Sequence, residues 1–327
     1  MQDYFILETP QKRFTKDFQN FLKIIPLTIT APMSPLLEDE SVLAYVVSGK
    51  GRIFINGISF ELKPGSLCQF HSYHTFLIEP DVRHPLQMLF LVDDYTLMGY
   101  WGFFQNDSTT EIDEIFYLPP VIYPNKETQK TIEHIFDIFR EEERSQEKHS
   151  LLIRSTLCAR IRYLYQYICK NHPKNCAHYQ PTPIWNIMIY ITVYGSMNLN
   201  LEKLSALFHL PAAAINKELR RITNMSFSQF LARARINYAS GALMLEHISL
   251  QSIAANSGFS SESSFFRQFY KYRGCTPKEY RRQIAAEKFQ NPNALVSDNA
   301  YEILHYIICN FNHEISLKTL CNDLYMT

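Results

Sequence analysis

The sequence predicts an α+β chain of several domains: an N-terminal antiparallel β-barrel, a helical segment and a C-terminal all-α domain. Three observations lead to this expectation. Short β-type runs separated by turn residues begin near residue 41. Helical periodicity replaces them from about residue 125. Two helix-turn-helix patterns then lie within residues 183–285. At 327 residues, the chain is long enough to bury two sizeable cores.

The barrel region, residues 1–122, is predicted from its turns. Residues 1–40 carry isolated apolar side chains between prolines, which predicts an arm with one or two edge strands. The runs and turns that follow are VLAYVV, Ser48-Gly-Lys-Gly51, RIFI, Asn56-Gly57, ISFEL, Pro64-Gly65 and SLCQF. Asn-Gly between two such runs is a strong hairpin signal, because both turn positions need a positive φ. Successive hairpins indicate a small barrel or sandwich.

The barrel region is rich in aromatic side chains. They are Phe54, Phe60, Phe70, Tyr73, Phe76, Phe90, Tyr95, Tyr100, Trp101, Phe103 and Phe104. We expect most of them to fill the core, because a small barrel needs large side chains, and a few to be available for stacking on a ligand.

Residues 123–182 are predicted to form two amphipathic helices and a linker. Apolar side chains recur at helical spacing from Ile132 to Phe139 and again over residues 151–168. The charged stretch REEERSQEKH is expected to separate the two helices. Residues 171–183 contain three prolines and few apolar side chains, which is typical of an interdomain linker.

The first helix-turn-helix is predicted within residues 201–222. Asn200 and Pro211 are expected to begin its two helices, with Ile215 and Leu219 facing inward. The outward face of the second helix offers Asn216, Lys217 and Arg220. Three consecutive alanines precede these residues and have few donors for bases. We therefore expect this unit to supply phosphate contacts and one or two base contacts.

A long helix is predicted to join the two units rigidly. Ser226 and Gln229 form a capping box at its start, and the pattern continues to Leu245, with Arg233 and Arg235 partly exposed. Two units held in this way can enter successive major grooves on one face of DNA, about 34 Å apart.

The second helix-turn-helix is LQSIAANSGFSSESSFFRQFYKYRGCTPKEYRR, residues 250–282. Gly258 permits a left-handed turn, and phenylalanines recur at helical spacing in the helix that follows it. The opposite face of that helix carries Glu262, Ser263, Ser264, Arg267 and Lys271, which can reach base edges or phosphates. Thr276 and Glu279 form a capping box for one more helix, whose Tyr280 is expected to pack under the motif.

The stretch IAANSGFSSESSFFRQFYKYRGCTPKEYRR resembles the signature of the AraC/XylS transcription regulators, which is close to IA-x-x-x-GF-x-x-x-SxFxRxFKKxxG-x-(S/T)P-x-x-YR. Tyr270 stands where the signature has lysine, and Pro211 where the family usually has serine. The resemblance implies a sequence-specific regulator of transcription, more commonly an activator, that binds double-stranded DNA.

The order VVSGKGRIFINGISFELKPGSLCQF resembles the cupin-like sensing domain that commonly precedes the AraC-type DNA-binding domain. This resemblance implies that the barrel binds a small effector, such as a sugar or another metabolite, which alters how the DNA-binding domains are positioned. The two helices after the barrel match the place of the family's dimer contact, so a homodimer is expected. Simple packing of these helices on the barrel is the alternative.

Charge is distributed unevenly along the chain. The net charge is zero, but residues 183–285 hold 12 Lys and Arg against 5 Asp and Glu, a balance of +7. Residues 1–182 have a balance of −4 and residues 286–327 one of −3. The basic segment coincides with the two helix-turn-helix patterns, which favours nucleic acid as the partner.

The seven cysteines are an odd number without a C-x-x-C pair, which is typical of reduced thiols in a cytoplasm. The N-terminus lacks the pattern of a signal peptide, and no apolar run has membrane-spanning length. We therefore expect a soluble cytoplasmic protein that is not an enzyme, does not contact membranes and carries no cofactor.

Two alternatives stay open for the barrel. One is a metal-binding cupin enzyme fused to a DNA-binding domain: catalytic cupins bind a metal through histidines and a carboxylate, and the candidates here are His71, His74, His84 and Glu79. Their spacing is not that of catalytic cupins, and a strand would place His71 and His74 on opposite faces, so we favour surface or pocket-lining histidines. The other alternative is a ligand-independent regulator whose barrel serves only for assembly.

The tail, residues 286–327, contains a partial repeat of the start of the helical domain. At a constant offset Ile187 pairs with Ile303, Tyr190 with Tyr306 and Leu201 with Leu317. The tail is either the opening of an incomplete second DNA-binding domain or an ordinary helical extension. Its negative charge argues against direct contact with DNA in both cases.

Overall fold

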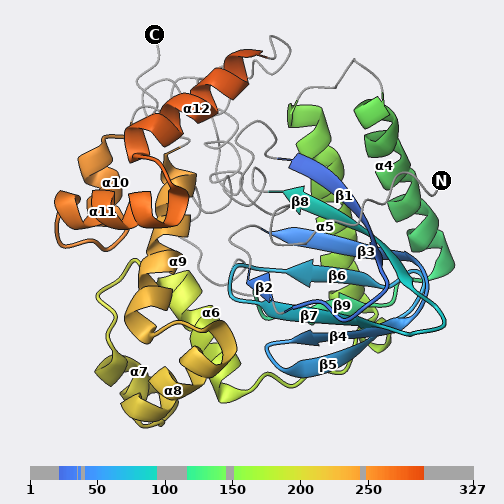
Figure 1. Ribbon diagram of the computed structural model, residues 1–327, viewed down its shortest axis with the longest axis horizontal. Coiled ribbons are helices and arrows are strands. Elements are labelled where there is room, and N and C mark those ends of the chain that lie inside the picture. Colours follow the sequence, from blue (N-terminus) through green and yellow to red (C-terminus); the bar gives the residue numbers. More distant parts are fainter. Residues whose placement is uncertain are drawn as a thin grey trace, which may run out of the picture.

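The computed structural model describes residues 22–34, 36–37, 41–93, 116–144, 151–243 and 248–290 (Figure 1). The predicted arm before residue 22, the aromatic residues between Tyr95 and Phe104, and the repeat in the tail lie outside the described residues.

The N-terminal region forms two antiparallel sheets, as the turn pattern predicts. The strands are β1 (Leu22–Ile29), β2 (Leu36–Leu37), β3 (Val42–Ser48), β4 (Gly51–Ile55), β5 (Ile58–Leu62), β6 (Leu67–Phe70), β7 (Thr75–Pro80), β8 (Leu86–Asp93) and β9 (Val121–Ile122). One sheet has the order β1-β8-β3-β6-β9 and the other β2-β7-β4-β5, so β1 and β2 are the expected edge strands. Asn56 and Gly57 join β4 to β5 with φ values of 48° and 85°, which confirms the predicted hairpin.

Apolar side chains from both sheets meet in one core. On β3, Val42, Ala44 and Val46 face the second sheet, and this inner layer includes Phe70 stacked on Phe76 at a centroid distance of 4.4 Å. Leu43 lies on the opposite face of the same strand and is also buried. Burial of both faces explains why β3 reads as a continuous apolar run and not as an alternating one.

Two helices, α4 (Lys126–Arg144) and α5 (Leu151–Asn171), cover the outer face of the five-stranded sheet (Figure 1). Tyr45 of β3 stacks on Phe136 of α4 at 5.9 Å. The charged stretch is not simply a separator, because α4 continues through its first half. Glu142 and Arg154 explain the extension: both are buried, and they form an ion pair of 3.1 Å between the two helices.

The predicted linker lies along the sheets. A short 3₁₀ helix, η2 (Pro173–Asn175), follows α5, and the backbone N–H of Ala177 then donates to the carbonyl of Val121 at 2.9 Å. Tyr179 packs against Phe60 of β5 at 6.5 Å. The backbone of the linker thus supplies a hydrogen bond to a carbonyl of β9. The polar composition of the linker does not predict this contact.

Seven helices complete the described fold. They are α6 (Pro183–Tyr194), α7 (Leu201–Phe208), α8 (Ala212–Thr223), α9 (Phe227–Ala242), α10 (Leu250–Asn256), α11 (Glu262–Arg273) and α12 (Pro277–Gln290). In Figure 1 α9 runs between the pair α7 and α8 and the group α10 to α12. Its capping box of Ser226 and Gln229 is present as predicted, and α9 ends at Ala242, three residues before the predicted end. No helix in the ranges given above is long and apolar enough to span a membrane.

Candidate nucleic-acid interface

The helical domain contains two helix-turn-helix units, α7–α8 and α10–α11. Each turn contains one residue with a left-handed backbone: His209 with φ 53° in the first unit and Gly258 with φ 82° in the second. Glycine is required at the second turn, since a Cβ on Gly258 would lie 2.4 Å from the carbonyl oxygen of Ser196. The tight turn therefore packs directly on the end of α6.

The two units repeat one another at a constant offset of fifty positions. The buried residues of α8, Ile215 and Leu219, correspond to Phe265 and Phe269 of α11. Both recognition helices end in a left-handed C-cap, and both are followed two residues later by the N-cap of a capping box. The pairs are Asn224 with Gly274, Ser226 with Thr276, and Gln229 with Glu279. The helices α8 and α11 therefore end in the same local geometry and are followed by the same kind of helix start.

The second unit is stabilised from beneath by α12. Tyr280 is fully buried, and its ring meets that of Phe269 edge-on at 5.3 Å, as the sequence predicts. The predicted capping box at the start of α12 is also present, with the backbone N–H of Thr276 donating to Glu279 at 2.8 Å. The face of α11 opposite Phe269 is thus left for solvent or for a partner.

Most of the predicted DNA-contacting side chains lie on exposed faces. On α8, Lys217 and Arg220 are exposed; on α11, Glu262, Ser263, Arg267 and Lys271 are exposed and Ser264 is half-buried. Asn216 differs from this group. It is half-buried, and its Oδ1 accepts a hydrogen bond of 2.9 Å from the backbone N–H of Phe227. This contact fixes the start of α9 against α8.

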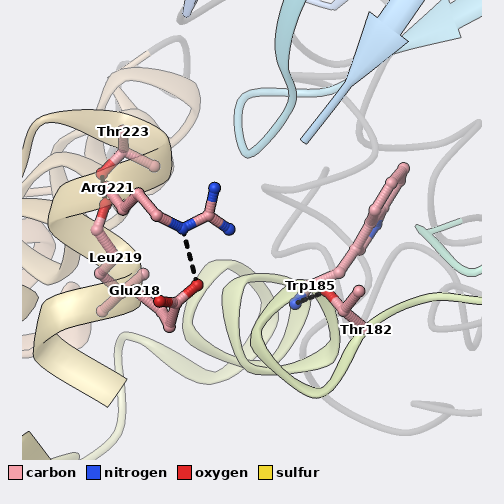
Figure 2. Close-up of polar contacts among 6 residues, drawn as sticks. All are labelled: Thr182, Trp185, Glu218, Leu219, Arg221 and Thr223. Carbon is pink, nitrogen blue, oxygen red and sulfur yellow. Dashed lines mark hydrogen bonds and ion pairs between the residues drawn. The ribbon is translucent and has the colours of Figure 1, made fainter. Parts of the chain in front are cut away.

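The repeat identifies Arg221 and Tyr270 as two further candidates for DNA contact, which the sequence analysis did not include. At the constant offset Lys217 corresponds to Arg267, Arg221 to Lys271, and Arg220 to Tyr270. Tyr270 is 59% exposed, so its ring is accessible to a partner. Arg221 is exposed and donates from Nε to Glu218 at 2.9 Å, as Figure 2 shows. Comparing the two units with each other would have found both residues.

Arginines on and around α9 fix the two units relative to each other. Arg235 donates to the carbonyls of Gly195 at 2.7 Å and Met197 at 3.1 Å, and its guanidinium lies over the ring of Phe259. Arg235 therefore connects α6 to the second turn. Arg273 of α11 is buried and donates to Ser240 of α9 at 2.9 Å.

Arg233 is buried, whereas its position on α9 predicted partial exposure. Its Nη1 donates to the carbonyl of Ser72, between β6 and β7, at 2.5 Å. The prediction is wrong because periodicity within α9 contains no information about the sheets. Arg233 instead joins the helical domain to the N-terminal sheets.

An aromatic cluster of His74, Trp185 and the half-buried Tyr179 lies at this junction. His74 meets Trp185 of α6 edge-on at 5.2 Å, and Tyr179 of the linker lies 5.0 Å from the same indole. Figure 2 shows how the start of α6 is capped: the backbone N–H of Trp185 donates to Thr182 Oγ1 at 3.4 Å. The cluster thus links β6–β7, the linker and α6.

The four candidate metal ligands are not brought together. Glu79 pairs with Arg52 at 3.4 Å, and His84 pairs with Asp81 at 3.3 Å, both at the surface. His71 and His74 are buried, contrary to a surface position, and lie in a turn and not in a strand. No group of three or more His, Cys, Asp or Glu side chains suited to a metal occurs among the described residues.

Both buried histidines are neutral. The amide nitrogen of Gln69 lies 2.9 Å from Nε2 of His71, and the backbone N–H of His71 donates to Nδ1 of His74 at 3.2 Å. Burial, and then the charge of Arg162 on α5, lower the pKa of His71 to about 3. Burial, and then His71, hold the pKa of His74 well below its usual value. Protonating either ring would place a charge inside the junction.

This burial predicts an acid-sensitive fold. A histidine with a lowered pKa in the folded state contributes stability above its unfolded pKa of about 6.5, and this contribution is lost as pH falls towards the folded pKa. We expect each of the two histidines to remove about 1 kcal/mol from the free energy of unfolding between pH 6.5 and 5.5. Urea unfolding at both pH values measures the loss. The double variant His71→Gln/His74→Gln should show a smaller loss, and an equal loss would contradict the assignment.

Comparisons with known proteins agree with the helical domain. A family model described as a helix-turn-helix domain matches residues 204–283. An uncharacterized HTH-type transcriptional regulator of Staphylococcus aureus strain MSSA476 is 24% identical over 158 residues, which are 45% of this chain and 21% of the relative. The RCS-specific HTH-type transcriptional activator RclR of Escherichia coli K12 is 30% identical over 84 residues, which are 26% of this chain and 30% of the relative. The chain thus spans less than a third of the length of these relatives.

The chain is also similar to solved structures of bacterial proteins. ToxT from Vibrio cholerae O395 is 12% identical, with 80% of this chain and 98% of that chain covered and a TM-score of 0.37. A DNA-binding transcriptional dual regulator from Escherichia coli K-12 is 24% identical, with 34% of this chain and 98% of that chain covered and a TM-score of 0.31.

The family match covers both helix-turn-helix units, from α7 to α12, including the stretch whose sequence resembles the AraC/XylS signature. The C-terminal part of the chain is therefore a helix-turn-helix domain of the AraC type.

Proposed function

We propose that the chain is a sequence-specific, DNA-binding regulator of transcription that reads DNA with α8 and α11. The observation that carries this proposal is the repeated geometry of the two units, which places Lys217 and Arg267 at equivalent exposed positions. The excess of positive charge in residues 183–285 supports it, since contacts to phosphates supply much of the affinity for DNA.

The two recognition helices have different chemistry. The first turn of α8 consists of alanines, whereas the corresponding turn of α11 is Glu262, Ser263 and Ser264. Hydroxyl and carboxylate groups can bond to base edges, and a carboxylate can accept from cytosine. We therefore propose that α11 specifies more of the sequence, and that Lys217, Arg220 and Arg221 of α8 mainly contact phosphates.

Selection from a pool of random duplexes with the full chain tests this proposal. The expected product is a bipartite site with two selected segments about one helical turn apart. The variant Arg52→Ala serves as a control, because Arg52 is an exposed arginine on the sheets and not on the helical domain. It should select the same site. If the recovered duplexes share no common sequence at any salt concentration, the proposal is contradicted.

We further propose that a small molecule controls the protein near the junction of the two regions. The Nε1 of Trp185 and the hydroxyl of Tyr179 are buried, and neither has a hydrogen-bond partner in the described part of the chain. A buried polar group without a hydrogen bond lowers the stability of the fold unless a ligand or water supplies the partner. A small polar metabolite, such as a sugar, would supply the missing partners. Such a ligand should raise the melting temperature of the full chain. It should not raise that of Trp185→Phe, which keeps an aromatic ring but has no N–H.

A homodimer through α5 is the remaining part of the proposal. Tyr163 and Tyr167 are 58% and 44% exposed, and their rings stack on each other at 6.2 Å. An exposed aromatic pair on a helix that already packs on the sheets is suited to contact a second copy. Sedimentation of Tyr163→Lys beside the unmodified chain tests it, because only the variant should be monomeric.

A further inference from the structure

Two cysteines lie side by side where α5 passes into the linker. Cys169 is in the last turn of α5, and Cys176 directly follows η2. Their thiols are hydrogen-bonded to each other, and both residues are half-buried. They differ from Cys68 and Cys158, which are fully buried in the two apolar layers.

The backbone on both sides of this pair is fixed. The N–H of His172 donates to the carbonyl of Ile168 at 2.8 Å, which continues α5 past Cys169. The N–H of Cys176 donates to Pro173 at 3.1 Å, and Cys176 also forms a β-bridge with Ile122. Both cysteines pack against the apolar layer between α5 and the five-stranded sheet. The fold thus holds the two thiols together.

The hydrogen bond gives the two thiols different reactivity. Because the S–H of Cys169 donates to Cys176, the bond lowers the pKa of the Cys176 thiol. The same bond, followed by burial, raises the pKa of Cys169. The thiolate is the nucleophile in thiol oxidation, so Cys176 reacts first and Cys169 is placed to resolve the product.

We propose that Cys169 and Cys176 form a dithiol that hydrogen peroxide converts to a disulfide, which ties the end of α5 to the start of the linker. The thiolate sulfur of Cys176 attacks one peroxide oxygen, and the O–O bond breaks. The other oxygen leaves as hydroxide and takes up a proton, giving water and a sulfenic acid on Cys176. The sulfur of Cys169 then loses its proton and attacks Cys176; the S–O bond breaks, and the hydroxyl group leaves as a second water.

The disulfide would act on the segment that leads to the helical domain. Cys176 precedes Tyr179, whose ring packs on Trp185 of α6. A covalent bond at Cys176 therefore restrains the chain just before this contact. The inference does not depend on DNA binding, since both the bond and its effect on the linker can be measured without DNA.

Mass spectrometry of the full chain tests the proposal. The Cys309→Ser/Cys321→Ser background removes two thiols outside the described residues. After treatment with hydrogen peroxide and alkylation, a non-reduced digest should contain a Cys169–Cys176 linkage. Further replacement of Cys169 by serine should leave a sulfenic acid on Cys176 that dimedone captures. The matched control Cys275→Ser, a half-buried cysteine between α11 and α12, should form the linkage as fast as the background protein.

Three results would overturn the proposal: no linkage, linkage of Cys176 to another cysteine, or dimedone capture at Cys169 in a Cys176→Ser variant equal to that at Cys176 in the Cys169→Ser variant. Circular dichroism establishes that each serine variant is folded. Limited proteolysis within residues 173–182 supplies a second readout, with cleavage expected to be several-fold slower after oxidation. Equal cleavage of the oxidised and reduced chains would show that the bond does not restrain the linker.

Discussion

Replacing Trp185 with alanine is expected to lower the free energy of unfolding by about 3–5 kcal/mol. The indole is fully buried and contacts His74 of the β6–β7 turn and Tyr179 of the linker. The apolar core continues from the sheets through α6 to α8 and α9, so Trp185 belongs to both regions at once. Its removal should therefore also weaken the coupling between them.

Urea unfolding with hydrogen exchange resolved for β3 and α9 measures both effects. In the unmodified chain the two elements should lose protection together, because one core joins them. In Trp185→Ala, α9 should lose protection at a lower urea concentration than β3. Phe139→Ala is the matched control, since Phe139 is equally buried but lies in the separate cluster between α4, α5 and the five-stranded sheet; in this variant α9 should not lose protection before β3. Simultaneous loss in Trp185→Ala, with only a small change in stability, would contradict the role of Trp185 as a junction.

Replacing Arg267 with alanine is expected to cost about 1–3 kcal/mol on the selected site, concentrated at one base pair. Arg267 is exposed on α11, one turn after the polar residues that begin the helix. Lys217 occupies the equivalent position on α8, where alanines precede it. If Lys217 contacts a phosphate, Lys217→Ala should instead weaken binding to all sequences alike and reduce the salt dependence.

Affinities of both variants for the selected site and for a random duplex, at two salt concentrations, separate these outcomes. Arg267→Ala should leave affinity for the random duplex almost unchanged, whereas Lys217→Ala should lower both affinities equally. Arg52→Ala should change neither. Equal losses on both duplexes for Arg267→Ala would show that this arginine does not read a base.

The sequence predicts the local structure well where one short signal determines it. The Asn56-Gly57 turn, the Asn200 cap and the Thr276 capping box each involve side chains and backbone within a few residues of one another. The exposed face of α11 follows in the same way from the spacing of its phenylalanines. Such features need no knowledge of the rest of the fold.

Long-range contacts account for what the sequence does not predict. The partner of Arg233 is a carbonyl on the N-terminal sheets, and Trp185 is buried partly by His74 of the same turn. The pairing of Cys169 with Cys176 depends on the turn of the chain at η2. Arg221 and Tyr270 are different, because the repeat between the two units is present in the sequence and would have identified them.

The proposed function requires that α8 and α11 each contact one segment of a shared DNA site. A hydroxyl-radical footprint of the full chain on its selected duplex tests whether both helices make this contact. Two protected segments are expected on one face of the duplex, about one helical turn apart. Lys217→Ala should weaken one segment and Arg267→Ala the other. A single protected segment, or the same segment weakened by both variants, would contradict it.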